Sequence, residues 1–170
     1  MSLWNREFSV QEIKTPFDFL KEQGKELERM TNGIIISMVS VYKGFFDAET
    51  GNDLSRVSLK SLANNDVRKE LGHGGESSWF IYEFSITSVG TPRYRYRAFV
   101  VKYNISIYPV KLAVEASIAE EIGLESIYEI CDTEADFVEV LSKILNSSII
   151  TNLVNNLLSI NVNSKLQNGG

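Results

Sequence analysis

Residues 80–97, FIYEFSITSVGTPRYRYR, decide the fold because the character of the side chains alternates along them. Successive side chains of a β-strand point to opposite faces of a sheet. In the first half the even positions are apolar: Phe80, Tyr82, Phe84 and Ile86. In the second half three arginines alternate with two tyrosines: Arg93, Tyr94, Arg95, Tyr96 and Arg97. We therefore expect two antiparallel strands with the tyrosines on the core face and the arginines on a polar face.

The turn at 89–92 joins these strands, and the alternation restricts its length. A slip of one residue would move every side chain to the wrong face. A three-residue loop, 90–92, keeps apolar residues opposite apolar ones, so we predict that loop. The expected apolar pairs are Tyr96–Ile86 and Ala98–Phe84. The expected polar pairs are Arg95–Thr87 and Arg97–Ser85, with Glu83 diagonal to Arg97.

The alternation changes phase after Ala98, because the apolar side chains then fall at odd positions such as Phe99 and Val101. A β-bulge near residues 98–101, or a strand that crosses from one environment to another, would produce this change. Pro109 cannot donate to a ladder, so the next strand, 108–116, begins there or lies at a sheet edge. A short strand at 126–131 is expected to follow.

Helices are expected at both ends of the chain. Thr15 as N-cap and Pro16 as the first helical residue predict a helix over 16–31. Gly24 weakens its interior by about 1 kcal/mol relative to alanine. Asn32-Gly33 then ends it, and a strand follows at 34–42. Near the C-terminus, Asp132 or Thr133 caps a first helix.

A second C-terminal helical run is uncharged from Ile144 to Leu157. Such a helix either packs on the sheet or forms a homodimer contact, and both alternatives remain open. The fold class is therefore α+β: a four- to five-stranded, mainly antiparallel sheet, with an N-terminal helix and C-terminal helices packed on it. Residues 1–165 are expected to form a single domain and 166–170 a frayed tail. Residues 44–78 are rich in turn signals.

Composition and residue counts exclude several kinds of function. The 170 residues carry a net charge of −5, which argues against a nucleic-acid or membrane-surface binder. Without a recognisable signal peptide or membrane span, we expect a cytoplasmic protein. Its one histidine, His73, and one cysteine, Cys131, cannot supply a catalytic triad or a zinc ligand set. We predict no enzyme activity, no metal and no cofactor.

Charge is distributed unevenly along the chain. Residues 93–111 carry basic side chains and no acid, whereas residues 112–142 carry nine acids and no base. Opposite segments can neutralise each other within the chain or between subunits. The candidate binding residues are Arg93, Arg95, Arg97, Glu83 and Lys102.

The leading hypothesis is a non-catalytic protein-interaction module that forms homo-oligomers through these charges or recognises an acidic protein. The alternative is a phosphorylated ligand or nucleic acid bound on the arginine face, although the tyrosines, facing the core, would leave no platform for base stacking.

Three short segments resemble a group of uncharacterised small bacterial proteins: Leu20-Lys-Glu-Gln23, Tyr94-Arg-Tyr-Arg97 and Tyr108-Pro-Val110. No activity or site is attached to that group, so the resemblance implies no function. The small acidic chaperones of bacterial secretion systems are similar in size, isoelectric point and α+β composition. That likeness makes a chaperone-like accessory protein a second alternative.

Overall fold

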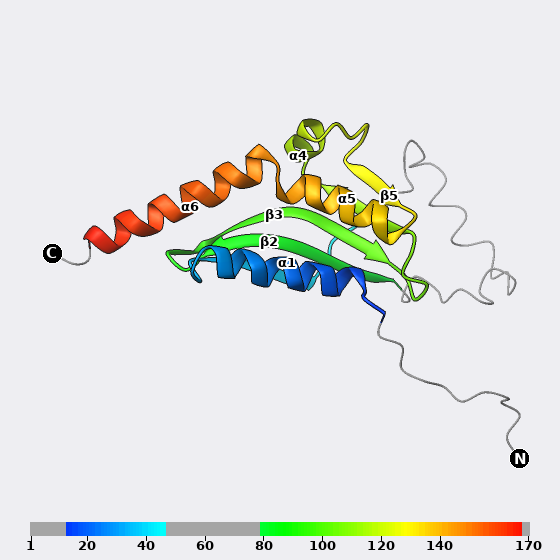
Figure 1. The fold of residues 1–170 in the computed structure, drawn as a ribbon, viewed down its shortest axis with the longest axis horizontal. Helices are drawn as coiled ribbons and strands as arrows, with labels where there is room; N and C mark the ends of the chain where they lie inside the picture. Colours follow the sequence, from blue (N-terminus) through cyan, green and yellow to red (C-terminus); the bar gives the residue numbers. More distant parts are fainter. Residues whose placement is uncertain (1–12, 47–78, 168–170) are drawn as a thin grey trace, which may run out of the picture.

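A computed structural model describes residues 13–46 and 79–167 and confirms the α+β fold (Figure 1). The helices are α1 (Pro16–Met30), α4 (Ala116–Glu121), α5 (Glu134–Leu145) and α6 (Ser148–Gln167). The strands are β1 (Ile35–Val41), β2 (Phe80–Ser88), β3 (Thr91–Tyr103), β4 (Val110–Val114) and β5 (Tyr128–Cys131). Most of the turn-rich segment 44–78, including His73, and the last three residues of the predicted tail lie outside the described residues.

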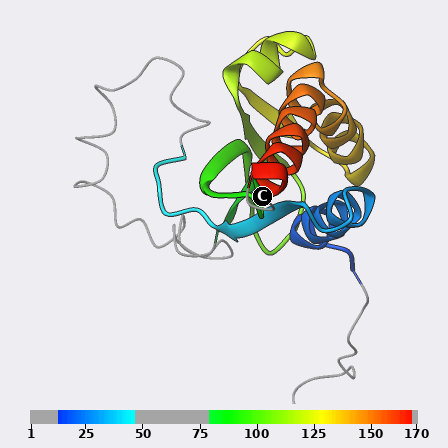
Figure 2. The ribbon, with the colours of Figure 1, turned by 90° about the vertical axis from the view of Figure 1, so that its left-hand side faces the viewer.

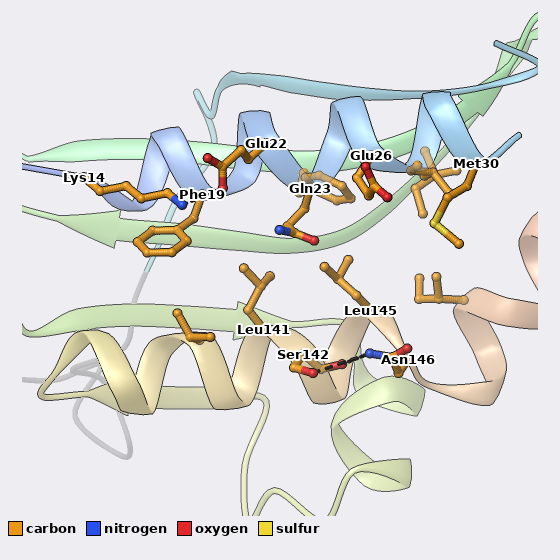
Figure 3. Close-up of a pocket in the computed structure, with 15 residues that line it drawn as sticks. Lys14, Phe19, Glu22, Gln23, Glu26, Met30, Leu141, Ser142, Leu145 and Asn146 are labelled. Carbon is orange, nitrogen blue, oxygen red and sulfur yellow. Dashed lines mark hydrogen bonds and ion pairs between the residues drawn. The ribbon is translucent and has the colours of Figure 1, made fainter. Parts of the chain in front are cut away.

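The five strands form one sheet in the order β1-β2-β3-β4-β5, and every neighbouring pair is antiparallel. Strand order therefore follows chain order. Helices α1 and α5 lie on the same face of this sheet, which we call the helix face (Figures 2 and 3). The opposite face, which carries Ser40, Glu83, Arg95 and Arg97, we call the polar face.

Local capping signals set the helix starts, as the sequence predicts. The Thr15 side chain accepts from the Asp18 N–H while the Asp18 carboxylate accepts from the Thr15 N–H, which forms a capping box at α1. Thr133 and Asp136 repeat this arrangement at α5. The predicted strand over 108–116 is shorter, because Glu115 accepts from the Ser117 and Ile118 N–H groups and starts α4. Helix α4 was not predicted from the sequence.

The buried core lies between the helix face and the helices. Phe84 and Phe99 stack at its centre, with ring centroids 5.1 Å apart and planes inclined by 6°. Fully buried aliphatic and aromatic side chains surround them, among them Leu20, Ile35, Ile86, Leu112, Phe137 and Ile144. The helix face therefore holds the apolar set expected from the even positions of β2.

The register between β2 and β3 matches part of the prediction. Tyr96 lies opposite Ile86, and Arg97 lies opposite Ser85, as expected. Phe84 pairs with Phe99 rather than with Ala98, because the bulge falls at Ala98, the first position of the predicted range. This extra residue is what reverses the alternation of β3.

The turn between β2 and β3 differs from the predicted three-residue loop. Ser88 pairs with Thr91, so the turn itself is Val89-Gly90. A second irregularity follows, in which residues 92–95 of β3 lie opposite Thr87 alone. The predicted Arg95–Thr87 pair is therefore absent, and the Thr87 hydroxyl donates to the Tyr94 carbonyl. Because of this irregularity Tyr96 still lies opposite Ile86, the pairing that the three-residue loop was predicted to produce.

Helix α6 packs on the sheet with part of its surface and extends beyond the sheet towards the C-terminus (Figure 1). The carboxylate of Glu121 accepts from the Ser148 and Ile149 N–H groups, which satisfies donors at the start of α6. Asn161 lies against the β2–β3 turn, where an added Cβ at Gly90 would come within 2.5 Å of its Oδ1. Packing on the sheet, one of the two alternatives for the uncharged helical run, therefore covers part of the surface of α6.

Among the described helices, none is long and apolar enough by itself to cross a membrane, although α5 and α6 pass that test as a pair bent by 48°.

Gly24 is a contact position rather than a weak point of α1. A Cβ added there would lie 2.0 Å from the Ser37 Oγ and 3.2 Å from the Ser37 Cβ of β1. We predict that Gly24→Ala lowers the free energy of unfolding by about 1–2 kcal/mol, because overpacking outweighs the gain in helix propensity. Chemical denaturation of the wild type and the variant measures this difference.

The matched background is Ser37→Ala, which removes the nearer atom, and in which Gly24→Ala is expected to cost less. An increase in stability on Gly24→Ala in the wild-type background would show that propensity dominates and that α1 and β1 are not in close contact.

Candidate functional site

The polar face brings together three of the five predicted site residues. Glu83 lies on β2, and Arg95 and Arg97 lie two residues apart on the neighbouring strand β3. The carboxylate of Glu83 forms ion pairs with both arginines, the one with Arg97 Nε at 2.5 Å from Oε2. We call these residues, together with Ser40, the Glu83 cluster. The ion pair between Glu83 and Arg97 agrees with the diagonal position that the sequence predicts for these two residues.

Ser40 adds strand β1 to the Glu83 cluster, whose other residues lie on β2 and β3. Its hydroxyl donates to Glu83 Oε1 at 3.0 Å and accepts from the Arg95 guanidinium at 3.0 Å. The side chain of Glu83 is only 8% exposed, whereas those of Arg95 and Arg97 are 39% and 52% exposed. One buried carboxylate thus holds two guanidinium groups side by side at the surface, and the cluster retains one positive charge.

The other two predicted site residues lie apart from the Glu83 cluster. Lys102 belongs to the polar face, beyond the bulge, where its ammonium group lies 4.8 Å from the ring centroid of Trp79 and 5.6 Å from that of Phe46. The Arg97 guanidinium similarly lies 5.3 Å from the Tyr42 ring centroid. These cation–π contacts order the basic side chains over aromatic rings. Arg93 is exposed and forms no ion pair with a described residue.

The acids of 112–142 are not the partners of the arginines within the described chain, so that part of the prediction is wrong. Glu115 caps α4, Glu121 caps α6 and Asp136 completes the α5 capping box. Glu139 pairs with Lys143 on α5. Three of these carboxylates therefore accept from backbone N–H groups at helix starts, while pairing of the arginines with acids of another subunit stays a prediction.

The two tyrosines between the arginines have different environments, and the prediction that both face the core is wrong for Tyr94. Tyr94 is 42% exposed, because it lies in the irregular segment opposite Thr87. Tyr96 is half-buried and its hydroxyl donates to Glu115 Oε2 at 3.2 Å. Burial and the nearby Glu115 carboxylate raise the pKa of Tyr96 to about 12.

Glu115 is held ionised in spite of its partial burial. Burial alone would raise the pKa of Glu115, but the Ser117 and Ile118 N–H groups and the Tyr96 hydroxyl lower it below its usual value. This carboxylate therefore has a structural role at the start of α4. No group of three or more His, Cys, Asp or Glu side chains within the described residues has the geometry of a metal site.

A second candidate site, which was not predicted from the sequence, lies on the helix face between α1 and α5 (Figure 3). It is a groove of about 440 Å³ with Phe84 and Ile86 as its floor. Apolar side chains from both helices form its walls: Phe19, Leu27 and Met30 from α1, and Val138, Leu141 and Leu145 from α5. We call it the α1–α5 groove.

The α1–α5 groove is bounded by an aromatic contact and by polar groups. Phe19 and Phe137 meet edge to face, with centroids 6.0 Å apart, and connect the two helices. Figure 3 shows Gln23, Leu141 and Leu145 pointing into the space between the helices. Met30 of α1 is 69% exposed and lines the groove. The groove thus combines an apolar interior with a few polar side chains, as ligand-binding sites commonly do.

Comparison with known proteins adds no relative. No protein-family model matches the chain, and no curated protein or solved structure shows significant similarity to it.

The Glu83 cluster predicts a specific order of mutational effects. Glu83→Gln removes the charge that both arginines share, so we expect it to lower the free energy of unfolding by about 1–3 kcal/mol. Arg97→Gln leaves Arg95 on the carboxylate and is expected to cost under about 1 kcal/mol, because Arg97 is half-exposed and screened by solvent. Denaturant unfolding of the single variants and the double variant measures both values.

Equal losses for the two single variants, or no loss for Glu83→Gln, would show that the carboxylate does not organise the arginines.

Proposed function

We propose that this protein is a non-catalytic interaction module that binds an amphipathic helix of a partner protein in the α1–α5 groove. The observation that carries the proposal is the groove itself, with an apolar floor and apolar walls between two helices. A volume of about 440 Å³ is in the range of binding pockets rather than of packing defects. Helix-in-groove recognition requires such a channel, into which the partner inserts apolar side chains at i, i+3 or i+4, and i+7.

Charge favours a partner helix with a basic polar face. The two helices that flank the groove carry seven acids: Asp18, Glu22, Glu26 and Glu28 in α1, and Glu134, Asp136 and Glu139 in α5. They carry four bases: Lys21, Lys25, Arg29 and Lys143. Their balance is 4 − 7 = −3, which attracts lysines or arginines on the polar side of a docked helix.

A chaperone-like accessory role is one form of this function, since such proteins bind segments of other proteins. We also expect the protein to form homo-oligomers, and this expectation does not depend on the groove. A reducing, cytoplasmic location belongs to the same proposal and is compatible with the buried, unpaired thiol of Cys131.

Peptide binding tests the proposal. The probe is a fluorescent amphipathic peptide of roughly 18 residues, with leucines on one helical face and lysines on the other. We expect it to bind at least about tenfold more tightly than a scrambled peptide of the same composition, and more tightly than a leucine–glutamate version. Fluorescence anisotropy measures the three dissociation constants.

Two groove variants localise the binding. Met30→Asp and Val138→Asp place a charge at exposed positions that line the groove, so the fold is retained and peptide affinity is expected to fall. The matched control is Ile105→Asp, at an exposed apolar residue that does not line this groove. Equal binding of the amphipathic and scrambled peptides, or full binding by Met30→Asp and Val138→Asp, would contradict the proposal.

A second candidate function is recognition of a phosphate-bearing ligand on the polar face. The observation that favours it is that two half-exposed guanidiniums share one carboxylate, with Lys102 on the same face. The remaining guanidinium donors fit phosphate oxygens, and Glu83 and Ser40 hold them in place beforehand.

Labelled single- and double-stranded oligonucleotides test this second function. We expect weak binding at low salt that falls steeply as salt is added, and that Arg97→Gln and Lys102→Gln each reduce. Arg29→Gln is the matched control, because Arg29 is an exposed, ion-paired arginine on α1. Competition by inorganic pyrophosphate would separate recognition of phosphate from recognition of bases. Absence of binding at low salt would remove this candidate.

A further inference from the structure

We propose that the outer edge of β1 pairs with the same edge of a second copy, which joins two five-stranded sheets across a two-fold axis. This inference is independent of the α1–α5 groove. β1 is an outermost strand of the sheet that residues 13–46 and 79–167 form, and β2 is its neighbour on the inner side. The occupant of the outer edge follows from the direction of the β1 backbone groups and from the β1 sequence.

The ladder with β2 shows which backbone groups of β1 point outward. Ile34 accepts from the Val89 N–H, and the Tyr42 N–H donates to the Ile81 carbonyl. In an antiparallel ladder every second residue is hydrogen-bonded to the neighbouring strand, so the backbone N–H and C=O groups of the even residues from 34 to 42 point towards β2. The odd residues Ile35, Ser37, Val39 and Val41 therefore direct their N–H and C=O groups away from the sheet.

The first of these outward groups has a partner within the chain. The Ile35 N–H donates to the Thr31 hydroxyl at 3.2 Å, and the nearest acceptor for that hydroxyl is the Leu27 carbonyl of α1, at 2.8 Å. The outward N–H and C=O groups of Ser37, Val39 and Val41 make no hydrogen bond with any described residue. The available edge is thus confined to three alternating residues at the end of β1.

This edge is complementary to itself. With the two-fold axis at Val39, Val39 pairs with its own copy and Ser37 pairs with Val41, so every outward group of the three residues meets an outward group. Because all three positions are odd, their side chains stay on the helix face of both sheets. β1 contains no charged residue, so no like charges meet across the axis.

Beyond Ile35, which Thr31 at the end of α1 covers, the sequence and register of β1 lack the features by which proteins protect an edge. Native edge strands commonly carry lysine, proline or a bulge that prevents pairing. The sequence of β1, IISMVSV, contains neither lysine nor proline, and its register with β2 is continuous. Val41 is 62% exposed. An uncharged, regular edge of this kind fits a second copy, whereas the groove and the polar face fit charged partners.

Proline at an outward-facing position tests the proposal while preserving the ladder with β2. Val41→Pro removes one outward N–H and no hydrogen bond to β2. Val41→Lys is the second variant, and it brings a charge to the edge without restricting the backbone. Ile105→Lys is the matched control, because it adds the same charge at an exposed apolar residue beyond the end of β3.

Sedimentation equilibrium measures the mass of each protein up to roughly 100 μM, and hydrogen exchange measures the amides of β1. We expect the wild type and Ile105→Lys to be dimers that dissociate on dilution, and both Val41 variants to be monomers. The Ser37, Val39 and Val41 amides should be protected in the dimer and exchange rapidly in the Val41 variants. Protection of the Met38 and Ser40 amides shows that the variants are folded.

A strictly monomeric wild type would overturn the proposal and would leave the edge to a peptide of another protein. A dimer that persists in both Val41 variants would also overturn it and would point to another surface, such as α6.

Discussion

The stacked pair of Phe84 and Phe99 is the contact on which both layers of the fold depend. These rings lie on neighbouring central strands, so they fix the register between β2 and β3 and form part of the surface on which the helices pack. The extra residue at Ala98 is what brings Phe99, rather than Ala98, opposite Phe84. A methyl group at that point would bury far less apolar area and would leave the Phe84 ring without its stacking partner.

The two faces of the sheet have opposite chemistry. The bulge at Ala98 changes which positions of β3 point to each face: the odd positions Arg95 and Arg97 lie on the polar face before it, and the even position Lys102 lies there after it. On the helix face, apolar side chains are buried against α1, α5 and part of α6. On the polar face, one buried carboxylate, Glu83, organises two guanidiniums and a serine hydroxyl. The basic side chains are further ordered by aromatic rings. The two candidate sites therefore differ in charge and hydropathy and share no residue.

Sequence alone predicts the features that are local. Thr15 and Thr133 identify the helix starts because a capping box needs only four neighbouring residues. Parity identifies the Tyr96–Ile86 pair, because an error of one residue would expose the core. The position of the turn could not be predicted, since an irregularity further along β3 compensates for the shorter loop. Helix α4 was missed because its N-cap is a glutamate, an uncommon residue there.

The sites depend on contacts between distant residues, which composition does not reveal. Counting charges pointed to the acids of 112–142 as partners of the arginines, but those near a helix start bind backbone N–H groups instead. Glu83 is the partner because pairing of β2 with β3 buries its carboxylate between two arginines. The α1–α5 groove could not be predicted, because the separation of two helices more than 100 residues apart in sequence determines it.

The identity of strand order and chain order has a consequence for folding. Strands β2 to β5 are linked by connections of 2 to 13 residues, so their pairing is local and closes with little loss of chain entropy. The connection from β1 to β2 spans residues 42–79 and is the longest in the sheet. We expect β2 to β5 to assemble first and α1 with β1 to dock last. An N-terminal unit that docks last across a long connection is also the unit most readily exchanged between two chains during refolding.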